Sequence, residues 1–115
     1  MTESTIDRAV FDELKEAAGA EFVQELVDTF LVEAPLLLDE LSRAFAQREA
    51  DAFRRGAHSL KSNANTFGAH ALGTMAKELE LGGLAPVVAA NGQSLEALAQ
   101  EYARVAAGLK ELCNA

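Results

Sequence analysis

The chain has 115 residues, half of them hydrophobic, and a net charge of −8. This length fits one domain with one modest core, and the acidic charge argues against nucleic acid and anionic membrane as partners. The single cysteine, Cys113, cannot form an internal disulfide, and neither a signal peptide nor an 18-residue apolar run is found. We expect one cytoplasmic domain over residues 1–115, with its core between about residues 20 and 112. The polar leader after Met1 favours a stand-alone protein.

Two amphipathic helices are predicted in the first half of the chain. A short one covers about residues 6–17 and ends near Gly19. Its apolar face consists of Val10, Leu14 and Ala17. In a long second helix, apolar residues recur in steps of three and four. They are Phe22, Leu26, Phe30, Ala34, Leu37, Leu41 and Phe45. Because this pattern stays in phase across Pro35, we expect a kink there, and two separate helices are the alternative.

Three further helices are predicted, over about residues 51–66, 69–81 and 94–112, with Ser94 as the N-cap of the last. The inward stripe of the first of these helices is Phe53, Ala57, Leu60, Ala64 and Phe67. That of the second is Leu72, Met75 or Ala76, and Leu79. That of the last is Leu95, Leu98, Tyr102, Val105, Leu109 and Leu112. Residues 81–92 are rich in glycine and contain a proline, which is typical of a connection. The pattern predicts an all-α fold, an up-and-down antiparallel four-helix bundle with a short additional N-terminal helix.

The charges are unevenly distributed along the chain. No acidic residue occurs between Asp51 and Glu78, although this interval contains both histidines and four basic residues. The basic residues are Arg54, Arg55, Lys61 and Lys77. A buried helix that tolerates few charges is one explanation, and a site that handles an anion is the other.

His58 lies beside the inward stripe of its helix, so we expect its imidazole at the surface. Its neighbours along the helix are basic or small and polar. They are Arg54, Arg55, Lys61, Ser62 and Asn65. No carboxylate is within helical reach, and this setting suits an imidazole that attacks phosphorus while positive charge stabilises the phosphoryl oxygens. A solvated histidine without a role is the alternative. His70 has no Cys or carboxylate beside it and does not suggest a metal site.

The run AHSLKSNANTFGA, from Ala57 to Ala69, resembles the signature of histidine-phosphotransfer (HPt) domains. In that family a Leu stands two residues after the His, a Lys three after it, and a Gly-Ala pair ten and eleven after it. The next helix continues the pattern at Leu72, Ala76, Leu79 and Glu80, and the resemblance extends over roughly residues 22–112. One departure is Ser62, where many members carry Gly; because Ser is still small, we expect a partner to reach the imidazole.

The resemblance implies that His58 accepts the phosphoryl group, that Lys61 stabilises it, and that Gly68 and Ala69 form the inter-helix turn. The chain would then be a phosphorelay intermediate that exchanges the group with an aspartate of a response-regulator receiver domain, which supplies Mg²⁺. A sensor histidine kinase of the hybrid type would be a second partner. We expect docking through Arg54, Arg55, Ser62 and Asn65.

Several absences are also expected from the sequence. The chain has no Gly-rich phosphate loop and no acidic metal cluster, so we expect no ATP site, no kinase activity, no metal and no cofactor of its own. We expect a monomer. A non-catalytic helical adaptor in which His58 is incidental is the alternative function, and a hydrolase that uses His58 as acid or base is a weaker one.

Overall fold

The computed structural model describes residues 5–114, which contain six helices and no strand. In chain order the helices are α1 (Arg8–Ala18), α2 (Ala20–Gln47), α3 (Ala50–Thr66), α4 (His70–Gly82), α5 (Leu84–Ala89) and α6 (Gln93–Asn114). The predicted all-α class is confirmed. Five of these helices were predicted, and the four with predicted ends agree with the structure to within two residues at each end.

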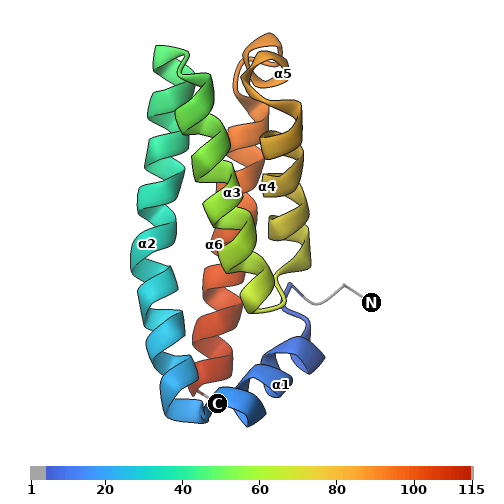
Figure 1. The fold of residues 1–115 in the computed structure, drawn as a ribbon. Coiled ribbons are helices and arrows are strands. Elements are labelled where there is room, and N and C mark those ends of the chain that lie inside the picture. The colour runs from blue at the N-terminus through green and yellow to red at the C-terminus, as the bar shows by residue number, and fades with distance from the viewer. Residues whose placement is uncertain (1–4, 115) are drawn as a thin grey trace.

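The helices α2, α3, α4 and α6 form an up-and-down antiparallel bundle (Figure 1). α3 packs between α2 and α4, and α6 contacts the same two helices, so α3 and α6 occupy opposite corners of the bundle. α1 lies across one end of the bundle, and α5 lies at the other end (Figure 1). This arrangement leaves the outer face of α3 uncovered along its length.

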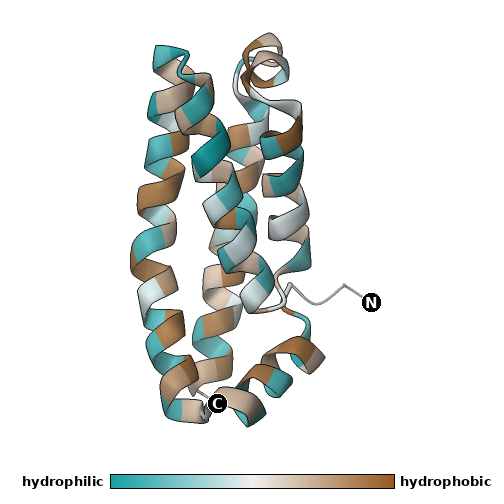
Figure 2. Ribbon diagram, in the orientation of Figure 1, coloured by the Kyte–Doolittle hydropathy of each residue, from teal (hydrophilic) through white to brown (hydrophobic). Residues whose placement is uncertain are grey.

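One apolar core runs through the bundle. Along each long helix, hydrophobic and hydrophilic segments alternate, as expected of helices that bury one face (Figure 2). The stripe predicted for α3 is buried throughout: Phe53, Ala57, Leu60, Ala64 and Phe67. In α4, Leu72 and Leu79 are buried as predicted, and of the two candidates between them Ala76 is fully buried while Met75 is partly exposed. In α6 the buried members are Leu98, Val105 and Leu109.

α2 is one helix that passes through Pro35, so the alternative of two separate helices is wrong. Pro35 is exposed, and it lacks the backbone amide that would donate to the carbonyl of Leu31, four residues earlier in α2. The predicted stripe is wrong at its start, because Phe22 is 50% exposed and Val23 is buried in its place. Steps of four residues overshoot the 3.6-residue turn, so a stripe extended back from Phe30 in two such steps rotates off the core.

α1 is fastened to the turn between α3 and α4. Asp7 caps α1 by accepting a hydrogen bond from the Ala9 amide, and its own amide donates to the Gly68 carbonyl at 2.9 Å. Gly68 has φ +79°, and a Cβ there would lie 2.9 Å from Val10 Cβ and 3.0 Å from the Asp7 carbonyl oxygen. The buried residue of α1 is Phe11; of the predicted face, Val10 and Leu14 are partly buried and Ala17 is exposed.

Two local predictions in the second half are corrected. The segment predicted as a plain connection contains α5, a helix of six residues with Val87 buried. Ser94 lies inside the first turn of α6 and is not its N-cap, because α6 begins at Gln93 after the turn at Asn91 and Gly92, both with positive φ. None of the helices formed by the described residues carries an apolar stretch sufficient to span a bilayer.

Candidate phosphotransfer site

His58 projects from the outer part of α3, and its side chain is 57% exposed. The neighbouring Ala57 and Leu60 are fully buried, which fixes the rotation of α3 and hence the position of the imidazole at the helix flank. The ring does not stand alone, however. Its Nδ1 atom lies 2.8 Å from Oε2 of Glu80, which comes from α4.

Glu80 also contacts the second predicted site residue. Its other oxygen, Oε1, is sealed from solvent and lies 2.9 Å from Nζ of Lys61. This contact is an ion pair without good hydrogen-bond alignment. Lys61 is one helical turn from His58 on α3, so a single carboxylate from α4 bridges the two side chains. The expectation that no carboxylate accompanies His58 is therefore wrong.

This bridge determines which nitrogen of His58 carries the proton. Lys61 first, and then His58, hold the pKa of the Glu80 carboxyl below its ordinary value of 4.5. Glu80 is consequently ionised at neutral pH and can only accept hydrogen bonds. Nδ1 must then be the donor, and in a neutral ring the lone pair lies on Nε2, the nitrogen on the opposite side from Glu80.

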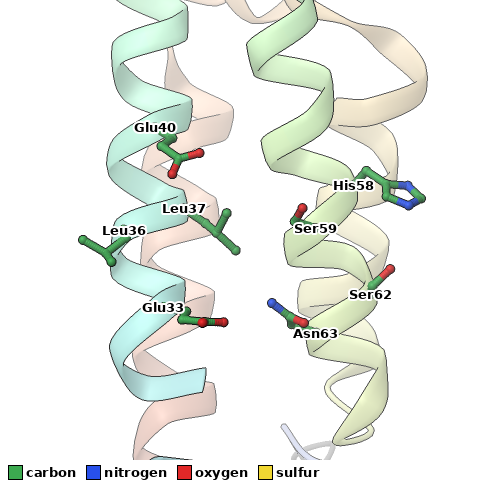
Figure 3. A pocket seen from close by; sticks show the side chains of 8 residues that line it. All are labelled: Glu33, Leu36, Leu37, Glu40, His58, Ser59, Ser62 and Asn63. Atoms are coloured by element: carbon green, nitrogen blue, oxygen red, sulfur yellow. The ribbon is translucent and has the colours of Figure 1, made fainter. Parts of the chain in front are cut away.

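A groove between α2 and α3 adjoins the histidine on its other side (Figure 3). It is lined by Glu33, Leu36, Leu37 and Glu40 from α2 and by His58, Ser59, Ser62 and Asn63 from α3. In Figure 3 the imidazole points away from α2, whereas Ser59 and Asn63 point toward it. His58 thus stands on the ridge between this groove and α4.

The remaining predicted site residues lie at several positions along α3 and do not form one cluster with His58. Ser62 is exposed and lines the groove with His58. Arg54 pairs with Asp51 of its own helix at 3.5 Å, and Arg55 is exposed on the same turn. Asn65 lies against α4, because a Cβ at Gly73 would overlap its side-chain amide. Asn65 is nevertheless exposed, so its amide covers Gly73 at the edge between α3 and α4.

The predicted turn residues both lie between α3 and α4, and both are buried. Gly68 adopts the left-handed conformation described above, and Ala69 immediately precedes α4. His70 makes a separate contact, with its Nε2 atom 3.1 Å from Oδ2 of Asp7, so the expectation that no carboxylate lies beside it is wrong. Among the described residues, no group of three His, Cys, Asp or Glu side chains is placed to hold a metal ion.

Comparison with known proteins agrees with this geometry. The family model described as Hpt domain matches residues 25–108. The chain belongs to the Hpt domain family. Its structure is similar to the crystal structure of histidine-containing phosphotransfer protein B (HptB) from Pseudomonas aeruginosa PAO1, with a TM-score of 0.81 and 28% identity. That likeness covers 98% of this chain and 97% of HptB.

A second relative is the sensor protein TorS of Escherichia coli (strain K12), which is 30% identical over 78 residues. These residues are 68% of this chain and 8% of TorS, so the chain spans a small part of that sensor protein. Membership of the Hpt family makes this chain a histidine-phosphotransfer domain of a phosphorelay, a class that ordinarily contains no kinase catalytic domain. Such domains interact generally with receiver domains and hybrid kinases.

Proposed function

We propose that His58 carries the phosphoryl group and exchanges it, through Nε2, with the aspartate of a response-regulator receiver domain. The observation that carries this proposal is the contact between Nδ1 and Glu80, because it leaves Nε2 unprotonated on an exposed ring. The competing idea, an adaptor with an incidental histidine, gives no reason for a carboxylate to orient that ring.

The proposed transfer replaces one P–O bond by one P–N bond. Nε2 of neutral His58 attacks the phosphorus of a receiver's aspartyl phosphate, the new P–N bond forms, and the P–O bond to the aspartate breaks. The aspartate leaves as a carboxylate and takes the electron pair of that bond. Nδ1 keeps its proton throughout, so the phosphorylated ring is cationic, and the Glu80 carboxylate stabilises that cation. In the reverse direction the same proton makes neutral imidazole the leaving group.

Lys61 contributes positive charge on the same helix. Its ammonium group is already placed one turn from the imidazole and is only 25% exposed, so it is held near the reacting ring. Charge fixed in advance stabilises developing negative charge without reorganising at the moment of reaction. Mg²⁺ and the acidic phosphorylation pocket belong to the receiver in this proposal, and a hybrid sensor kinase stands upstream. The protein acts in the cytoplasm as a monomer.

The decisive test is to follow label from a phosphorylated receiver domain into the wild-type protein, His58→Gln and His70→Gln. Wild type and His70→Gln should become labelled with an acid-labile, alkali-stable phosphoramidate, and His58→Gln should take no label. Because the His58 side chain is peripheral to the core, circular dichroism of all three proteins should agree. Labelling of His58→Gln at the wild-type rate would assign the chemistry to another residue.

Glu80→Gln tests how the ring is oriented. A glutamine amide can either accept from Nδ1 or donate to it, so the proton is no longer held on that nitrogen. We expect transfer to slow roughly tenfold, in line with residues that orient a reactive imidazole. The ¹⁵N chemical shifts of His58 should show a mixture of the two protonated forms. An unchanged spectrum with slower transfer would mean that Glu80 acts through Lys61 alone.

A further inference from the structure

The groove beside His58 has one acidic wall. On α2, Glu33, Leu37 and Glu40 point toward α3, and their spacing of four and then three residues places them on one face of the helix (Figure 3). The backbone positions of the two glutamates are about 10 Å apart along the helix axis, with the leucine between them. Leu36 lies beside this row, points away from α3, and is 56% exposed.

No ion pair within the described residues engages these two carboxylates. Neither Glu33 nor Glu40 takes part in any ion pair formed by residues 5–113, and both are exposed. The opposite wall of the groove offers Ser59, Ser62 and Asn63, which carry no charge. Three cations lie within helical reach of the groove. Lys61 is engaged with Glu80, whereas Arg43, three residues after Glu40 on α2, and Arg55, four residues before Ser59 on α3, pair with neither glutamate. The carboxylates of this wall are therefore available to pair with cations of another molecule.

Resting on the function proposed above, we propose that this α2 wall docks a receiver surface in which an apolar side chain lies between two basic ones. The apolar group would cover Leu36 and Leu37, and the lysine or arginine groups would pair with Glu33 and Glu40. The docking face is then bipolar. Its α4 side presents Lys61 beside the receiver's acidic pocket, and its α2 side presents carboxylates, so only one orientation of the receiver matches both.

Charge reversal on the α2 wall tests this proposal. The variant Glu33→Lys/Glu40→Lys is compared with Glu13→Lys/Glu111→Lys, which changes the net charge equally at exposed positions on α1 and α6. The donor is whichever phosphorylated receiver domain, from a panel of purified ones, labels the wild-type protein fastest. Initial rates are measured at low and high salt, and circular dichroism verifies that each variant is folded.

We expect the groove variant to accept label roughly tenfold more slowly at low salt, and the control variant to stay within about twofold of wild type, because charges at an interface edge act mainly on association rate. The difference should shrink at high salt, where exposed charges are screened. A low-molecular-weight phosphoramidate should modify His58 at equal rates in all three proteins. Equal slowing of the groove and control variants would overturn the proposal, because the net charge of the protein would then account for the effect. Slower reaction with the small donor would overturn it too, by assigning the glutamates to the chemistry.

Leu36→Ser tests the apolar component, and the exposure of this residue means that the fold does not depend on it. Transfer from the receiver should slow several-fold while the small donor is unaffected, since an apolar contact at the interface is lost. Transfer at the wild-type rate would overturn the apolar part of the proposal. Failure of the wild-type protein to accept label from any receiver is a distinct result, because it contradicts the proposed function itself.

Discussion

Replacing Gly68 by alanine measures how firmly α1 is held against the turn between α3 and α4. Gly83 provides a comparison, because its φ of +77° is almost that of Gly68 at +79° and a Cβ there has no atom within 4 Å. Its ψ of −166° lies outside the left-handed helical region, so alanine there costs about 1–3 kcal/mol of backbone strain, whereas a left-handed L-residue at Gly68 costs about 1–2 kcal/mol. Only Gly68→Ala also drives a methyl group against Val10 and the Asp7 carbonyl, and overpacking of this kind costs about 1–3 kcal/mol.

The expected losses in free energy of unfolding are therefore about 2–5 kcal/mol for Gly68→Ala and about 1–3 kcal/mol for Gly83→Ala. For a domain of this size each kcal/mol corresponds to roughly 4 °C in Tm, so Gly68→Ala should lower the Tm by about 8–20 °C. Urea and thermal denaturation followed by circular dichroism at 222 nm provide the measurement. A loss below about 2 kcal/mol for Gly68→Ala would refute the reasoning, because the backbone cost alone would then account for it and α1 would exert no steric demand on the turn.

Three further predictions concern single side chains. Lys61→Ala should slow transfer roughly tenfold to a hundredfold without unfolding the protein, if its charge is used only in the transition state; rates equal to wild type in both directions would remove Lys61 from the mechanism. Ser62→Gln should block a receiver but not a small phosphoramidate donor, because the longer side chain stands one turn from His58; equal failure with both donors would place Ser62 in the chemistry. The hydrogen bond from His70 lowers the pKa of Asp7 below 3.8, so its stabilising contribution is present above that pH and is lost as the pH falls through the lowered value. Urea unfolding of wild type and Asp7→Asn should accordingly differ above pH 4 and converge in stronger acid, and a constant difference would contradict this account.

The sequence was most informative about structural features that depend on a single helix. The stripe of α3 and the exposed flank position of His58 follow from the rotation of a single helix, which the 3.6-residue period defines. The family resemblance supplied the roles of His58 and Lys61, which remain predictions. α5 was missed because six residues contain too few turns for periodicity to be visible.

Glu80 shows why the rest of the site could not be predicted. The absence of acidic residues from Asp51 to Glu78 is real along the chain, but α4 runs antiparallel to α3 and returns Glu80 to the side of His58. Glu33 and Glu40 arrive from α2 in the same way. Neighbour relations between helices depend on bundle packing, which a pattern within one helix does not encode. The only signal was that Glu80 continued the family pattern.

If His58 carries the phosphoryl group as proposed, the carboxylate that it shares with Lys61 limits how much the net charge of the site changes on loading and unloading. At rest, with a neutral imidazole, the charges of Glu80 and Lys61 cancel. A phosphoryl group brings about two negative charges. If the ring lost its proton on loading, the site would change by that full amount. Because Glu80 retains the proton on Nδ1, the ring becomes positive and the net change is about one charge. Loading and unloading then demand less rearrangement of water and ions, which favours passage of the group in either direction.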